Sequence, residues 1–86
     1  MIKLSVAIIT YNEEQRVGAC IDSVQDIADD IVIVDSYSND NTEKICRERG
    51  VNFIKHEFKG HIQQKNYALS QAKFDRILSL DAYEVP

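Results

Sequence analysis

Two aspartates stand at the ends of apolar runs, a position from which a carboxylate can reach a ligand. Asp35 and Asp81 each occupy the last position of such a run. An ionised carboxylate offers only acceptor oxygens, so it can bind the hydroxyl and N–H groups of a nucleotide or hold a hard divalent cation. Polar residues also follow the other two apolar runs, at positions 10–14 and 56–60. The alternative is that each aspartate only caps the turn that follows it.

Four short apolar runs would position these side chains. They occupy residues 4–10, 30–35, 51–54 and 76–81. The first two runs are rich in β-branched residues and lack polar alternation, which is typical of strands buried on both faces of a parallel sheet. The segments between the runs have helical periodicity, as in Val17, Cys20, Ile21 and Val24. The order β-α-β-α-β-α-β predicts a Rossmann-like, mostly parallel α/β sheet, whose ligands bind outside the carboxyl ends of the strands.

Local signals mark the ends and faces of the predicted helices. Asn12 with Gln15, and Asp40 with Glu43, have the spacing of a capping box. Gly50 stands where the second helix would end in a left-handed conformation. The apolar stripe of the third helix is predicted to contain Ile62, Ala68, Leu69 and Ala72.

The bulk composition suits one small soluble domain. The 86 residues are 44% hydrophobic and 28% charged, with a net charge of -4. This acidic balance argues against a nucleic acid or an anionic membrane surface as the partner, because both need clustered Lys and Arg. The longest apolar run, residues 6–9, is far shorter than the ~20 residues of a membrane span, and the opening lacks a secretory signal. We expect a cytoplasmic protein in which Cys20 and Cys46 are buried, reduced thiols.

The common phosphate-binding loops do not occur in the sequence. No GxGxxG segment follows the first apolar run, and no GxxxxGK(S/T) segment occurs. The three glycines, Gly18, Gly50 and Gly60, are too dispersed to form a glycine-rich loop. A bound phosphate would therefore need another device, such as a metal ion on acidic residues or a suitably placed Lys.

Four segments together resemble one known family. They read SVAIITYNEE at residues 5–14, IVDSYSNDNT at 33–42, Gly60 followed by KNYAL at 65–69, and LSLDA at 78–82. In this order they are similar to family 2 glycosyltransferases with the GT-A fold, and they most resemble bacterial lipopolysaccharide-core glucosyltransferase-like proteins. The resemblance covers essentially the whole chain. It implies that residues 1–86 are the nucleotide-sugar-binding N-terminal part of a GT-A domain, truncated relative to the complete enzyme.

The resemblance also implies a reaction and positions for its donor. The complete enzyme would move a sugar from a nucleotide-diphosphate donor, a UDP-sugar, to a glycan or lipopolysaccharide acceptor, in the cytoplasm or at the periphery of the inner membrane. The implied substrate-binding residues are Thr10, Tyr11, Asn12, Glu13, Asp35, Lys65 and Asp81. Asp35 would accept hydrogen bonds from the base or ribose, Lys65 would lie near the diphosphate, and Asp81 would begin a DxD metal motif. The implied strand order, 3-2-1-4, places the two aspartates on either side of the first strand.

Two departures from the family pattern concern the metal and the catalytic base. The DxD motif reads Asp81-Ala82-Tyr83 in this chain, and a tyrosine that is neutral at pH 7 is a poor ligand for a hard cation. Asp81 and Glu84 are then the candidate metal ligands, and we expect weak binding of Mg²⁺ or Mn²⁺, the cations of the family. We assign no catalytic residue, because the carboxylate that would deprotonate the acceptor hydroxyl is expected beyond Pro86.

Other interpretations stay open at this stage. The chain could hold a nucleotide without transferring a sugar, as a non-catalytic module or an inactive fragment, and Tyr83 favours this alternative. A receiver-like signalling domain would need an acidic pair after the first strand, which residues 12–14 imitate poorly. His56 and His61 lack metal-site spacing and are interpreted as surface-loop residues. The run at residues 76–81 would leave an unpaired sheet edge, so we also expect self-association.

Overall fold

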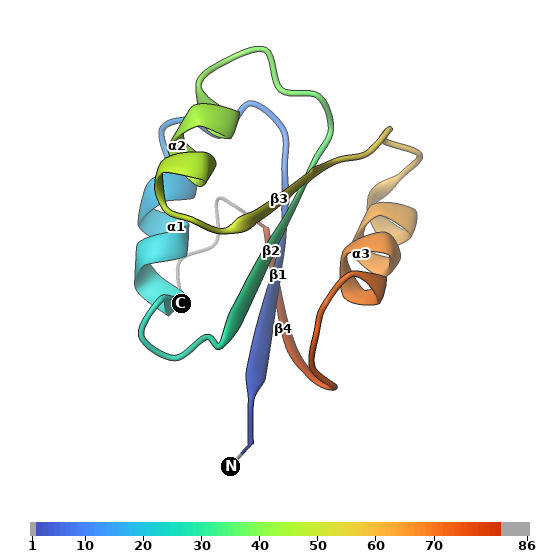
Figure 1. Ribbon diagram of the computed structural model, residues 1–86. Coiled ribbons are helices and arrows are strands. Elements are labelled where there is room, and N and C mark those ends of the chain that lie inside the picture. Colours follow the sequence, from blue (N-terminus) through green and yellow to red (C-terminus); the bar gives the residue numbers. More distant parts are fainter. Residues whose placement is uncertain (1, 82–86) are drawn as a thin grey trace.

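The computed structural model describes residues 2–81 of the chain. Its elements are β1 (Leu4–Thr10), α1 (Val17–Val24), β2 (Asp30–Asp35), α2 (Thr42–Glu48), β3 (Asn52–Lys55), α3 (His61–Ser70) and β4 (Arg76–Asp81). All pairings are parallel, and the four strands form one sheet in the order β3-β2-β1-β4 (Figure 1). The predicted α/β fold class and strand order are confirmed. The third strand begins and ends one residue later than predicted, and the other three have the predicted bounds.

Helices cover both faces of the sheet, with α1 and α2 on one side and α3 on the other (Figure 1). The larger apolar cluster lies on the α1 and α2 side and buries Val6, Ile8, Val17, Cys20, Ile21, Val24, Ile33, Cys46 and Leu80. The smaller cluster lies under α3 and buries Ala7, Ile9, Val32, Val34 and Ala68. Successive residues of a strand point to opposite faces, so the central strands need apolar side chains on both faces between their polar ends. This explains the absence of polar alternation in β1 and β2.

The predicted apolar stripe of α3 is wrong at Ile62 and Leu69, and Ala72 lies beyond the end of the helix. Ile62 is 78% exposed and Leu69 is 36% exposed, whereas Ala68 is buried as predicted. The polar side chain of Gln64 is also buried, at 1% exposure. Hydrogen bonds from Gln64 to the end of β2 and to the residue after β3 set the rotation of α3. Polar contacts, rather than apolar periodicity, therefore decide which face of this helix is inside.

Neither predicted capping box forms as expected. Asn12 adopts a left-handed conformation, with φ of 50°, and its Oδ1 accepts a hydrogen bond from the Asn39 N–H at 2.7 Å instead of capping α1. Asp40 accepts from the N–H of Thr42, at 3.0 Å, without the reciprocal contact of a capping box. The C-terminal prediction for α2 is confirmed, because Gly50 follows the helix with φ of 71°.

Both cysteines are buried thiols, as predicted. Burial is the main cause that raises the pKa of the Cys46 thiol to about 12, and the negative charge of Asp35 adds to it. None of the helices described between residues 2 and 81 has the length and apolar content needed to cross a bilayer.

Candidate functional site

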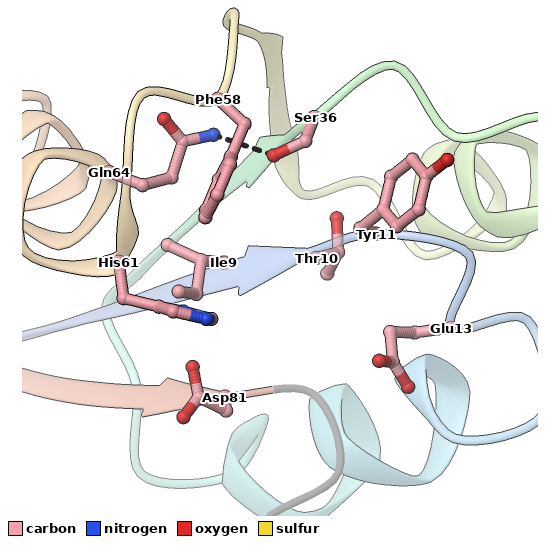
Figure 2. A pocket seen from close by; sticks show the side chains of 9 residues that line it. All are labelled: Ile9, Thr10, Tyr11, Glu13, Ser36, Phe58, His61, Gln64 and Asp81. Atoms are coloured by element: carbon pink, nitrogen blue, oxygen red, sulfur yellow. Dashed lines mark hydrogen bonds between the residues drawn. The ribbon is translucent and has the colours of Figure 1, made fainter.

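The carboxyl ends of β1, β2 and β4 meet at one edge of the sheet. In the strand register, Thr10 pairs with Asp35 and Ile9 pairs with Asp81. A cavity of about 390 Å³ opens at this edge, within the roughly 300–1,000 Å³ of small-molecule sites. Its walls, drawn in Figure 2, are formed by Ile9, Thr10, Tyr11, Glu13, Ser36, Phe58, His61, Gln64 and Asp81. The edge at which the sequence predicts a ligand therefore contains a cavity of suitable size.

The predicted substrate-binding residues fall into two groups. Those that line the cavity are Thr10, Tyr11, Glu13 and Asp81. Asn12, Asp35 and Lys65 do not line it, and each contacts a residue or loop that borders it. The predicted second metal ligand, Glu84, lies outside the described residues, as do Ala82 and Tyr83.

Asp35 fixes the end of β2 to the end of β1. Its side chain is 1% exposed, and its Oδ1 accepts hydrogen bonds from Thr10 Oγ1, at 2.7 Å, and from Ser38 Oγ. Its Oδ2 accepts from the Ser38 N–H at 2.7 Å. A carboxylate has about four acceptor positions, so the protein itself occupies three of them. In the structure, this carboxylate joins Thr10, which lines the cavity, to the loop after β2.

The loops after β1 and β2 are joined by hydrogen bonds. The Asn12 N–H donates to Ser38 Oγ at 2.8 Å, and the Glu13 N–H donates to Thr42 Oγ1 at 2.9 Å. The Glu14 N–H donates to Asp40 Oδ2 at 3.2 Å. Burial opposes the charged form of Asp40, but hydrogen bonds from Thr42 and Glu14 outweigh it and lower the pKa of this carboxyl. These contacts fix the loop that carries the cavity residues Tyr11 and Glu13.

Gln64 attaches α3 to the same edge. Its amide nitrogen donates to Ser36 Oγ at 3.0 Å and to the carbonyl oxygen of His56 at 3.3 Å. Its Oε1 lies 3.0 Å from His56 Nδ1, so that ring nitrogen must carry the hydrogen because an amide oxygen only accepts. The His56 ring stacks on Tyr67, with 3.7 Å between ring centroids. Gln64 thereby holds the segment between β3 and α3 against β2.

Sequence reasoning missed the aromatic wall of the cavity. Phe58 and His61 line it and contact each other edge to face, with ring centroids 5.2 Å apart. His61 is exposed, as predicted, but it is the first residue of α3 rather than a loop residue, and it borders the cavity. The signal was present, because residues 56–60 follow the third strand and so belong to the carboxyl edge.

Lys65 and Asp81 come together at the end of β4. Lys65 Nζ lies 3.8 Å from Asp81 Oδ2, and Asp81 is the less exposed partner, at 13% against 41%. Within residues 2–81, no group of three His, Cys, Asp or Glu side chains could hold a metal ion. Protein-bound Mg²⁺ is usually held by one or two carboxylates together with phosphate oxygens. Asp81 therefore fits a divalent cation that is shared with a diphosphate, rather than a cation held by protein side chains alone.

Comparison with known proteins places these features in a family. The model of the family described as "Glycosyl transferase family 2" matches residues 5–84. An uncharacterized glycosyltransferase of Rickettsia felis is 40% identical over 98% of the chain, which spans 30% of that relative. The lipopolysaccharide core biosynthesis glycosyltransferase LpsC of Rhizobium meliloti is 36% identical over 96% of the chain, which spans 32% of it. The chain thus spans less than a third of the length of these two relatives.

Solved structures share the fold. Glucosyl-3-phosphoglycerate synthase of Mycobacterium tuberculosis in complex with UDP superposes with a TM-score of 0.85 at 21% identity, over 98% of this chain and 35% of that one. The same enzyme with Mn²⁺, UDP and glucosyl-3-phosphoglycerate gives a TM-score of 0.82 at 22% identity, over 94% and 33% of the two chains. At this identity the likeness shows a common GT-A architecture.

Proposed function

Because the chain belongs to glycosyl transferase family 2, we propose that residues 1–86 form the nucleotide-sugar-binding N-terminal part of a GT-A transferase domain. The complete enzyme moves a sugar from a nucleoside-diphosphate donor to an acceptor hydroxyl. The observation that carries this proposal is the cavity between the ends of β1, β2 and β4, the edge at which parallel α/β sheets bind ligands.

The nucleoside would occupy the side of the cavity nearest Thr10. Tyr11 is 54% exposed, which leaves a ring face available to stack on the base. Asn12 and Glu13 follow Tyr11 in the same loop, and their N–H groups are held by hydrogen bonds to the segment after β2. Asp35 supports this side by holding Thr10, and one acceptor position of its carboxylate is left for a ribose hydroxyl or a base N–H.

The diphosphate would occupy the side nearest Asp81. Lys65 is close to this carboxylate, and its ammonium group would supply positive charge to the phosphates. Asp81, with phosphate oxygens, would hold a Mg²⁺ or Mn²⁺ ion, and such a cation offsets the charge that develops on a leaving diphosphate. Glu84, outside the described residues, is the proposed second ligand.

The donor and acceptor classes rest on different support. UDP as the nucleotide is supported by the structural neighbours, which were solved with UDP. A glycan or lipopolysaccharide acceptor is supported by one relative named for lipopolysaccharide core biosynthesis. Such an acceptor would place the complete enzyme in the cytoplasm, at the periphery of the inner membrane.

One observation favours a second function, a module that binds nucleotide and transfers nothing. Within residues 2–81, Asp81 belongs to no group of three His, Cys, Asp or Glu side chains that could hold a metal ion, and the third residue of the DxD motif is Tyr83. Release of UDP from UDP-glucose separates the two functions, because a binding module would retain UDP affinity without releasing UDP from the donor.

Titration calorimetry tests the nucleotide site. UDP should bind weakly, and ADP should bind more weakly still. The Lys65→Met variant should lose most of the affinity for UDP and little of the affinity for uridine, because the contact is to phosphate. Absence of binding by any nucleotide, with and without Mn²⁺, would exclude this function for the chain.

The metal proposal has its own test. UDP affinity is measured with and without Mn²⁺ in the unmodified chain and in Tyr83→Asp. We expect little Mn²⁺ dependence in the first and a clear dependence in the second, since the variant restores a carboxylate to the motif. Strong dependence in the unmodified chain would instead make Glu84 the second ligand.

We also propose that the chain self-associates through β4. Among the described strands, β4 pairs with β1 alone, and Ile77 and Leu78 are only partly buried. An unpaired edge of this kind is a template for pairing with another chain. Sedimentation at micromolar concentration should show dimers or larger species, and a monomer at all concentrations would contradict the proposal.

A further inference from the structure

The charge of the cavity wall raises a problem for an anionic ligand. Glu13 and Asp81 both line the cavity, and the chain as a whole is acidic, with a net charge of -4. A diphosphate would therefore be repelled unless local groups provide hydrogen-bond donors or positive charge. Among the residues that line the cavity, His61 is the one side chain that can carry a positive charge.

The helix places His61 beside Lys65. His61 is the first residue of α3, and residues four apart lie on the same face of a helix. The Lys65–Asp81 ion pair, at 3.8 Å, shows that this face of α3 is turned toward the end of β4. In Figure 2 the imidazole of His61 reaches into the cavity between Ile9 and Asp81, with ring nitrogen directed inward.

Phe58 restrains the orientation of the imidazole. The two rings meet edge to face, with an interplanar angle of 79°, an arrangement that aromatic pairs favour. Phe58 also lines the cavity, so the pair forms a continuous wall. His61 is exposed and lines the cavity, so its ring nitrogens are accessible to a ligand.

We propose that His61 binds the phosphates of the nucleoside-diphosphate donor and forms, with Lys65, a pair of donors for them. The proposal rests on the nucleotide-binding function above and extends it to a residue outside the family motifs in the sequence. A neutral imidazole donates one N–H hydrogen bond and a protonated one donates two, so the contact exists in either state. His61 lines the cavity beside Asp81, and Lys65 pairs with Asp81 at 3.8 Å, so both groups lie where they can offset the negative charge that repels a diphosphate.

A different role would also place an aromatic ring in this wall. His61 and Phe58 could pack against the nucleobase, with the imidazole acting as a flat surface only. The two roles make opposite demands, because phosphate binding needs the N–H group and base packing needs the ring. A phenylalanine at position 61 keeps the ring and removes the N–H, whereas a glutamine keeps an N–H and removes the ring.

The experiment compares uridine, UMP and UDP as probes. Calorimetric affinities are measured for the unmodified chain, His61→Phe, His61→Gln and the neighbouring control Ile62→Ala, whose side chain is 78% exposed. We expect His61→Phe to weaken UDP binding roughly tenfold, the scale of a lost hydrogen bond to a charged group, and to leave uridine unchanged. His61→Gln should retain most of the UDP affinity, and Ile62→Ala should retain all of it. Thermal unfolding of each variant checks that the fold is intact.

The outcomes separate the inference from the function on which it rests. If His61→Phe binds UDP as well as the unmodified chain does, or loses uridine and UDP equally, the phosphate role of His61 is wrong while the nucleotide site stands. If the unmodified chain binds none of the three probes, the nucleotide site and the role of His61 both fail. A second readout, the NMR shift of the His61 ring nitrogens, should change on adding UDP and not on adding uridine.

Discussion

The paired strands β1 and β2 carry the same kind of polar contact at both ends. Ser5 Oγ donates to Asp30 at 2.8 Å where the strands begin, and Thr10 Oγ1 donates to Asp35 at 2.7 Å where they end. Both pairs are register partners, and both are buried. Because the pairs are an odd number of residues apart along each strand, they lie on opposite faces of the sheet.

The surroundings of the two contacts differ. At the beginning of the strands, Asp30 also accepts from the Lys73 N–H at 3.0 Å, and Ser5 Oγ accepts from the Phe74 N–H at 3.0 Å. These bonds close the connection between α3 and β4. At the other end, Asp35 orders a loop that borders a cavity. A buried aspartate at a strand end is therefore a structural element in both cases, and the one on the carboxyl edge supports a loop beside the cavity.

Replacing each aspartate in turn should have the largest effect. Asp35→Ala leaves Thr10 Oγ1 and both donors of Ser38 without their acceptor and should destabilise the fold by about 3 kcal/mol. Asp30→Ala, which loses two donors, should cost about 2 kcal/mol. UDP affinity should fall by about 1–3 kcal/mol in Asp35→Ala and stay unchanged in Asp30→Ala. Urea unfolding measures the stability and calorimetry measures the UDP affinity. If both variants lose UDP affinity equally, the carboxyl end of the strands has no special role in binding.

The α3 anchor offers a matched pair of adjacent glutamines. Gln64→Leu leaves Ser36 and the His56 carbonyl without their partner and should cost about 1–2 kcal/mol of stability. It should also weaken UDP binding, because the segment with Phe58 loses its attachment to β2. Gln63→Leu, at an exposed position of the same helix, should change stability by less than about 0.5 kcal/mol. If the two variants bind UDP equally well, α3 does not position the cavity wall.

For the two hydroxyl donors, the larger loss of stability should be at the beginning of the strands, whereas for the two aspartates it should be at the end. Ser5→Ala removes two hydrogen bonds and Thr10→Val removes one, so the serine variant should lose more stability, about 1–2 kcal/mol against about 1 kcal/mol. Thr10→Val alone should weaken UDP binding. A variant series in which stability and affinity fall together would show that affinity reports only on folding.

The effect that is smallest near neutral pH concerns the buried thiol of Cys46. The pKa of Cys46 is raised above its ordinary value to about 12, through burial and then the charge of Asp35. A raised folded-state pKa contributes stability that is complete below the ordinary thiol pKa and lost as pH rises through the folded value. Stability should therefore decline between about pH 9 and pH 12, with a smaller decline in Cys46→Ala. A thiol reagent at pH 8 should react with Cys46 only after unfolding.

The sequence predicted most of the fold because its strands carry a strong local signal. β1 and β2 are rich in β-branched residues, and their bounds could be read directly. The inward position of Gln64 and the outward position of Ile62 could not be read, because they depend on Ser36 and His56, which reach the helix only after the chain has folded. Apolar periodicity treats every polar residue as external and fails where a polar side chain has buried partners.

The cavity was predictable to the same extent. Thr10, Tyr11, Glu13 and Asp81 follow or end strands, so topology alone brings them to one edge. The positions of the aromatic wall residues depend on the rotation of α3, which the apolar pattern misassigned. Asn12 and Asp40 had the spacing of helix caps, but Asn12 accepts from Asn39 and Asp40 accepts from Glu14 as well as from Thr42. No local pattern reports the contacts that join separate loops.

The hydrogen bonds between the β1–α1 and β2–α2 loops bear on how this family can be recombined. Backbone N–H groups of residues 12–14 donate to side chains of the second loop, and the Asn39 N–H donates back to Asn12. A chimera that takes one loop from a relative would leave N–H groups of both loops without their hydrogen-bond acceptors. The two loops should therefore be exchanged together, and a change in one should require a matching change in the other.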